Sequence, residues 1–204
     1  MILALTQAPS PLWYFARAAG FVSLILLAFT VGLGLALTLR WRTDNWPTFI
    51  SDGLHRYLAT VFFVFLGIHV ETLLLDPFTK FTLSDLLIPF VSTYRPFWMA
   101  LGICAAELAL ALALSVHIRR WIGYRAWRVI HYGTYATFPL VIAHGLGAGS
   151  DTRTWWGLAI YILCGSAVSG LALARFFGGR AETEAAANAR RGMEARRASA
   201  AARD

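Results

Sequence analysis

The sequence predicts an all-α polytopic membrane protein, a bundle of five transmembrane helices with a short interfacial helix in the outer loop between spans two and three. Of its 204 residues, 58% are hydrophobic and 14% are charged, whereas a soluble domain carries about 25% charged residues. The apolar residues form long runs separated by short polar loops, as in membrane-spanning bundles. Tryptophans lie near the ends of these runs, where lipid headgroups are expected.

Five apolar runs are long enough to cross a hydrocarbon core, which takes about 20 helical residues. They cover residues 12–39, 54–75, 97–116, 127–147 and 155–177. The segment after the second run is too short and too broken by prolines to cross. We expect an interfacial helix there, at about residues 83–91, with Ser84 as its N-cap. Residues 1–178 then form the membrane domain, and residues 179–204 form a basic cytoplasmic tail that is helical or disordered.

The arginines indicate the orientation of the bundle. With five spans, the loops after the first and third spans share one side with the C-terminal tail, and most arginines collect there. Lys and Arg mark the cytoplasmic side of a membrane protein, so the N-terminus is expected outside and the C-terminus in the cytoplasm. We expect an integral protein of a bacterial plasma membrane. The formal net charge of +7 follows from this asymmetry, and no nucleic-acid partner is expected.

Two pairs of histidines dominate the chemistry. His55 and His69 lie fourteen positions apart in the second span, so their side chains leave nearly the same helix face, roughly 21 Å apart along the axis. His131 and His144 repeat the arrangement in the fourth span, thirteen positions apart. Thirteen steps on an ideal helix rotate the second ring by about 140°. Pro139 lies between them and is expected to kink the helix so that both rings face the second span.

Four imidazoles at two levels suit two stacked b-type haems, because neutral histidine is a common axial ligand of haem iron. Matching the ligands by depth pairs His55 with His131 at an inner haem iron. The same criterion pairs His69 with His144 at an outer haem iron. No CxxCH motif occurs, which argues against covalent haem attachment.

Several other polar residues are candidates for smaller roles. Arg56 and Arg128 neighbour the inner ligands in sequence and are candidates for cofactor binding through haem propionates, although each is also explained as a topology residue. Glu107, midway along the third span, and His117, at its end, have no assigned role. A quinone is a further candidate ligand.

At these residues the chain resembles a known family. HRYLATVFFVFLGIH (55–69) and HYGTYATFPLVIAH (131–144) are similar to the ferric reductase-like transmembrane domain of NADPH oxidases, ferric reductases and the haem subunit of the methionine-sulfoxide reductase system. The resemblance covers residues 12–177 and implies two stacked haems on the four histidines. The stretch LLDPFTKFTLSDLLIPF (74–90) resembles the outer loop of short bacterial members.

The chain departs from the larger members of that family in one respect. The oxidases and ferric reductases continue into a cytoplasmic flavin and nicotinamide domain, but no GxGxxG fingerprint occurs here. We therefore expect no FAD or NAD(P) site in this chain and no self-contained oxidation of NAD(P)H.

The predicted function is electron transfer across the bilayer, from inner to outer haem, as the electron-transfer subunit of an oxidoreductase. The reductant is expected to be a separate flavoprotein or a quinol, and the acceptor lies at the outer face; the sequence leaves both open. The alternative is a haem-free transporter or assembly factor that uses the histidines for metal or proton handling. A single metal site requires ligands within about 2 to 2.5 Å of one ion, which two levels roughly 20 Å apart do not offer.

Overall fold

The computed structural model describes the backbone of residues 9–39 and 48–201, and the side chains of residues 9–39, 50–178 and 193. Within these ranges the secondary structure is entirely helical. The helices are α1 (Pro11–Thr38), α2 (Thr48–Leu75), α3 (Leu83–Leu87), α4 (Pro96–His131), α5 (Thr134–Ala148) and α6 (Trp155–Ala201), with a 3₁₀ turn η1 (Asp151–Arg153) before α6.

Four segments are long and apolar enough to cross a membrane: Pro11–Thr38, Ile50–Leu75, Pro96–Ala148 and Trp155–Gly178. These segments confirm the predicted all-α class and the character of an integral membrane protein. The predicted third and fourth spans fall within one of them, the 53 residues of Pro96–Ala148.

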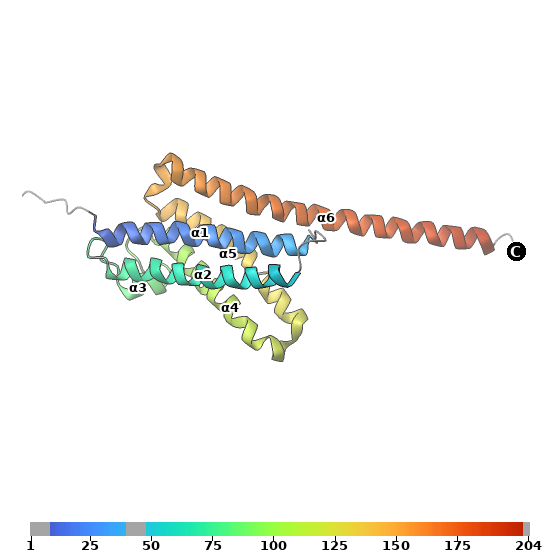
Figure 1. The fold of residues 1–204 in the computed structure, drawn as a ribbon, viewed down its shortest axis with the longest axis horizontal. Coiled ribbons are helices and arrows are strands. Elements are labelled where there is room, and N and C mark those ends of the chain that lie inside the picture. The colour runs from blue at the N-terminus through green and yellow to red at the C-terminus, as the bar shows by residue number, and fades with distance from the viewer. Residues whose placement is uncertain (1–8, 40–47, 202–204) are drawn as a thin grey trace, which may run out of the picture.

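That segment is a hairpin. Inside α4, Gly123 has φ 80° and ψ 158°, a left-handed conformation that glycine adopts without a Cβ clash. Figure 1 shows α4 running away from α3, turning, and returning into α5. The hydroxyl of Tyr94 donates to the carbonyl of Ala148 at 3.0 Å, so the hairpin ends at the level where it began. We call residues 119–128, around Gly123, the hairpin tip.

The loop helix α3 begins and ends differently from the prediction. Its N-cap is Thr82, not Ser84: the Thr82 hydroxyl accepts from the backbone of Asp85, whose side chain accepts from the backbone of Thr82. This reciprocal capping box satisfies two free backbone donors. The helix ends at Leu87, four residues before the predicted end at 91, because Ile88 precedes Pro89 and is extended (φ −112°, ψ 117°).

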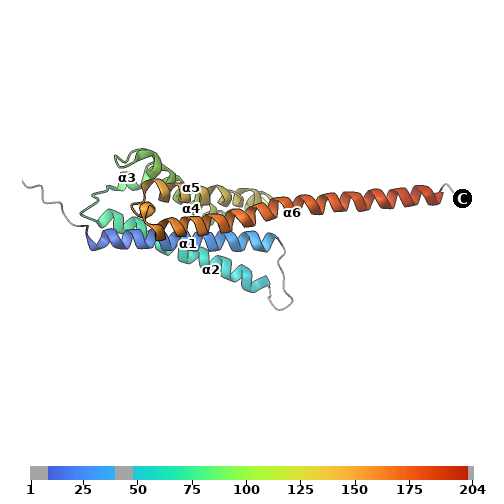
Figure 2. The ribbon, with the colours of Figure 1, turned by 90° about the horizontal axis from the view of Figure 1, so that it is seen from above.

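Helix α1 forms the centre of the bundle, since it packs against α2, α5 and α6. The two views in Figures 1 and 2 show it running alongside these helices. Its buried side chains join others from α2, α4, α5 and α6 in one apolar core, made of Leu24, Leu27, Val31, Leu35, Phe62, Ala109, Phe138, Tyr161 and Val168. Phe62 lies midway between His55 and His69, so this core separates the two histidine levels.

Helix α6 is a single helix of 47 residues, roughly 70 Å long at 1.5 Å per residue. Both views show it continuing beyond the rest of the bundle (Figures 1 and 2). The predicted tail is therefore helical as far as Ala201, and no helix break marks the predicted boundary at residue 178.

Candidate functional site

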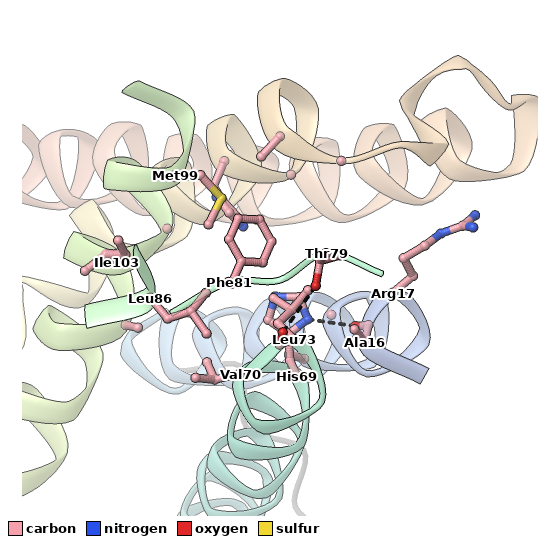
Figure 3. A pocket seen from close by; sticks show the side chains of 18 of the residues that line it. Ala16, Arg17, His69, Val70, Leu73, Thr79, Phe81, Leu86, Met99 and Ile103 are labelled. Carbon is pink, nitrogen blue, oxygen red and sulfur yellow. Dashed lines mark hydrogen bonds between the residues drawn. The ribbon is translucent and has the colours of Figure 1, made fainter. Parts of the chain in front are cut away.

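Two of the four histidines line one cavity at the α3 end of the bundle. His69 of α2 and His144 of α5 both border a space of about 620 Å³, together with Gly20 of α1 and Gly102 of α4. Pockets for small molecules and cofactors have volumes of about 300 to 1,000 Å³. Figure 3 shows His69 in this cavity, with Thr79, Phe81, Leu86 and Met99 among the side chains around it. We call His69 and His144 the cavity pair.

Three histidine rings are fixed by the same type of hydrogen bond. Nδ1 lies 2.7 Å from the carbonyl oxygen of Ala16 in His69 and 2.9 Å from that of Trp98 in His144. In His55, Nδ1 lies 3.1 Å from the carbonyl oxygen of Thr30. A carbonyl only accepts, so Nδ1 carries the proton in each ring and Nε2 keeps its lone pair. This is the arrangement usual for metal-binding histidines, where the second nitrogen donates to a carbonyl or carboxylate.

A glycine lies four residues after each accepting carbonyl, in the helix that faces the ring. A Cβ atom at Gly102 would lie 2.5 Å from Nδ1 of His144, and one at Gly20 would lie 3.1 Å from Nδ1 of His69. At Gly34 the nearest atom would be Cε1 of His55, at 3.4 Å. Glycine inside a helix costs roughly 0.5 to 1 kcal/mol relative to alanine. Here it leaves the space that the imidazole occupies.

The fourteen-residue spacing of α2 is repeated on α1. Ala16 and Thr30 supply the carbonyls to His69 and His55, and Gly20 and Gly34 make room for the same two rings. Helices α1 and α2 are antiparallel, so one alignment of the two helices places a carbonyl of α1 beside each histidine of α2. The sequence carries this signal as two glycines at the histidine spacing. From the sequence alone, both are small residues that could let helices or a flat porphyrin approach closely, as small residues at helix contacts commonly do. Sequence reasoning did not single out Gly102 at all.

At the other level, the rings of His55 and His131 lie beside each other. Their centroids are 6.3 Å apart and their planes are inclined by 69°. We call these residues the tip pair. Unlike the other three rings, His131 has no hydrogen-bond partner for its buried Nδ1 among the residues that the structure describes.

The path between His131 and His144 differs from the predicted one. Sequence reasoning placed both on one helix kinked at Pro139. In the structure His131 is the last residue of α4, and α5 begins at Thr134. Tyr132 (φ −63°, ψ −14°) and Gly133 (φ −55°, ψ −21°) keep right-handed helical dihedrals between the two helices, and Pro139 lies inside α5. The backbone N–H of Gly133 donates to the carbonyl of Ile130, three residues earlier, so the turn is tightened there.

The predicted arginines do not contact the histidines through any hydrogen bond of the described chain. Arg56 and Arg128 are both exposed, and Nε of Arg128 donates to the hydroxyl of Tyr132 at 3.0 Å. His117 is exposed, with Nδ1 3.3 Å from the carbonyl oxygen of Leu114 in its own helix. Glu107 is exposed on the surface of α4.

An ion pair joins α1 to η1 at the cavity end of the bundle, and sequence reasoning missed it. Arg17 of α1, which lines the cavity, is bonded to Asp151, and the Asp151 side chain is only 7% exposed. The two residues are 134 positions apart, so the pair joins the first helix to the turn before α6.

Asp76, just after α2, ties the loop to α1. Its carboxylate accepts from the hydroxyl of Ser10 and from the backbone N–H groups of Phe78 and Thr79. Burial opposes its ionisation, but these hydrogen bonds outweigh that effect and hold the pKa of Asp76 below its ordinary value.

Comparison with known proteins assigns neither a family nor a function to the chain. No protein-family model, curated protein or solved structure matches the chain.

Proposed function

We propose that the chain is a di-haem b-type membrane cytochrome, with one haem iron held by the cavity pair and the other by the tip pair. The observation that carries the proposal is the pairing of histidines at two levels with Nδ1 bound to a backbone carbonyl in three of the four rings. This leaves Nε2 as the free lone pair in each of those rings. Haem, when bound, supplies one-electron redox chemistry.

The distance within the tip pair supports this assignment. The ring centroids of His55 and His131 are 6.3 Å apart. At this separation the two imidazoles would hold one haem iron between them, each offering one ring nitrogen.

The cavity pair supports it through the space between its rings. The cavity is mostly lined by apolar side chains, and the glycines at 20 and 102 allow the rings of His69 and His144 to sit deep against α1 and α4. The chain's own contribution is to hold these imidazoles in one tautomer, to keep the two levels roughly 21 Å apart along α2, and to exclude water.

The proposal includes five crossings. Each limb of the hairpin, residues 96–122 and 124–148, exceeds the about 20 residues that a helix needs to span the bilayer. With five crossings the arginine-rich tip lies in the cytoplasm and α3 lies at the outer interface, which makes the tip pair the inner site and the cavity pair the outer site. Electrons then enter from a cytoplasmic flavoprotein or a membrane quinol and leave to an acceptor at the outer face.

The same proposal links the chain to the ferric reductase-like transmembrane domain, in its short form without a flavin domain. The support is the spacing of the four histidines and their arrangement as two facing pairs. The alternative of a zinc-type site in a transporter is less favoured. Among the residues that the structure describes, no three His, Cys, Asp or Glu side chains converge on one point, whereas such sites use three or four protein ligands.

An absorbance spectrum of the detergent-purified protein tests the proposal. On addition of dithionite we expect a sharp reduced b-type band and about two haems per chain. A folded but colourless preparation from haem-replete cells would refute it. Zinc or copper in place of haem, measured by elemental analysis of the same sample, would favour the alternative.

A further inference from the structure

Two buried side-chain nitrogens, one in the tip pair and one stacked against it, have no hydrogen-bond partner among the described residues. Among the described residues, Nε1 of Trp127 and Nδ1 of His131 are the buried side-chain polar atoms without one. The two rings are stacked, with centroids 4.9 Å apart and planes inclined by 23°. An indole nitrogen is a donor only, and Nδ1 of His131 is a donor when Nε2 is the free nitrogen. The missing group is therefore an acceptor.

The charge around Trp127 indicates that this acceptor is an anion. The guanidinium of Arg119 lies over the Trp127 ring, 5.2 Å from its centroid. The hairpin sequence contains no Asp or Glu between Glu107 and Asp151, so the hairpin has no carboxylate of its own to offer there. A buried donor without a partner costs about 1 to 3 kcal/mol, which favours a bound group that pairs with it.

The position of Trp127 identifies the group. Trp127 lies in the hairpin tip, four residues or about one helical turn before His131. A group held between His131 and His55 would therefore have Trp127 on its side toward Gly123. A porphyrin of the b type carries two carboxylate side chains on one edge, and both are acceptors.

We propose that Trp127 and Arg119 form the binding site for a propionate of the haem held by the tip pair, with the indole N–H donating to the carboxylate. This inference rests on the proposed function. It adds to the sequence-based candidates Arg56 and Arg128; Nε of Arg128 donates to the hydroxyl of Tyr132. Trp127 would be a positioning residue, since it would hold a carboxylate of the haem and not the iron.

The test compares haem with its dimethyl ester, in which both carboxylates are methylated. Each is reconstituted into the full-length protein and into Trp127→Phe, which keeps a stacked ring but removes the N–H. Transfer of haem to excess apoglobin is followed by absorbance, and the phase that disappears in His55→Ala belongs to the tip pair. With native haem we expect this phase to be about tenfold faster in Trp127→Phe. With the dimethyl ester, the transfer rates of Trp127→Phe and the parent should differ by less than about twofold.

Trp121→Phe is the matched control. Trp121 also lies under a guanidinium, that of Arg120 at 4.9 Å, but its ring is 73% exposed, so its loss should change neither rate. Arg119→Gln should accelerate the same phase, and Arg119→Lys should restore part of the difference, because the positive charge acts on the same carboxylate.

The outcomes separate the two proposals. Equal acceleration with both forms of haem would show that Trp127 acts only by packing against His131, and would overturn the inference. Unchanged release from a Trp127→Phe protein that holds two haems would also overturn it and leave the proposed function standing. A parent protein that takes up no haem would defeat the proposed function itself.

Discussion

The two histidine pairs differ in how their rings are held. At the cavity pair, both rings are bonded to backbone carbonyls and both fit against glycines. At the tip pair only His55 has this support, and His131 is stacked on Trp127 with its Nδ1 unpartnered. The cavity pair is therefore fixed by backbone carbonyls, whereas His131 of the tip pair depends on the side chain of Trp127, which lies in the hairpin limb after Gly123.

The difference shows that the residue type at a position and the contacts that hold its ring in place are separate properties. All four positions are histidines, yet only three have the carbonyl and glycine that fix the tautomer. Hydrogen bonds at the second nitrogen raise the basicity of a ligating imidazole. Under the proposed function, we therefore expect a haem at the cavity pair to be retained more tightly and to have the lower reduction potential.

Removal of a ligand is expected to have the largest effect. His69→Ala or His144→Ala should leave one haem per chain, and His55→Ala or His131→Ala should leave the other, since each iron then keeps a single protein ligand. Haem per chain and the reduced spectrum measure this. His117→Ala, at an exposed histidine outside both pairs, should keep two haems. If any of the four variants retained both haems, its pairing would be wrong.

The glycines that face the histidine rings, Gly102, Gly20 and Gly34, test how closely each ring must pack against its neighbouring helix. Gly102→Ala should destabilise the protein by about 1 to 3 kcal/mol and displace the His144 ring, because overpacking a rigid site has this cost. Gly20→Ala should have a smaller effect and Gly34→Ala the smallest, following the space at each position. Thermal unfolding and haem content of the three variants check the order.

Gly67→Ala is the control for this series, since a Cβ there meets nothing within 4 Å. It should be neutral or stabilising by up to about 1 kcal/mol through helix propensity. A Gly67→Ala protein as unstable as Gly102→Ala would show that the histidine rings do not set the requirement.

The ion pair between Arg17 and Asp151 tests how far side chains at the cavity end contribute to stability. Arg17→Gln should cost about 2 kcal/mol, because it leaves the buried Asp151 carboxylate without its charged partner. Arg153→Gln, at an exposed arginine nearby in sequence, should change stability by less than about 0.5 kcal/mol. A double-mutant cycle with Asp151→Asn isolates the interaction. Additive effects of the two substitutions would contradict a direct contribution of the pair.

The smallest expected effect is a dependence on pH at Asp76. Its pKa is lower in the folded protein than the ordinary value of 3.8, so the unfolded chain takes up the proton first as the pH falls. Stability from this group is complete above the ordinary value and is lost as the pH falls through the lowered one. Asp76→Asn should cost about 1 kcal/mol at neutral pH.

Thermal unfolding as a function of pH checks this prediction. The difference in stability between the parent and Asp76→Asn should narrow toward pH 3. A gap that widened on acidification would mean that the folded state does not favour the ionised form of Asp76.

The long-range plan of the bundle follows from hydropathy, including the reversal at Gly123, which lies in the predicted loop between the third and fourth runs. The apolar runs starting near Leu12 and ending at Leu75 predicted α1 and α2 to within a few residues, apart from the start of α2, because composition and length decide a membrane helix. The interruption between His131 and Thr134 does not follow from hydropathy, because it lies inside the apolar run predicted as the fourth span.

The candidate site divides in the same way. The spacing of His55 and His69 is a property of one helix, so helical geometry alone places both rings on one face. The supports of those rings come from other helices: Gly102 was missed because its partner, His144, lies 42 positions further along the chain. The capping of α3 by Thr82 instead of Ser84 was a choice between neighbouring hydroxyls, decided by the carboxylate three residues after the true cap.

The repeated contacts between α1 and α2 have a mechanical consequence. Two helices joined at one point can still pivot about it, but α1 and α2 are joined at Ala16–His69 and again at Thr30–His55, almost four turns apart. Their crossing angle and their axial offset are then both fixed. The interval between the two levels is thus set by backbone carbonyls of α1, at residues 16 and 30, and by the helical rise of α2.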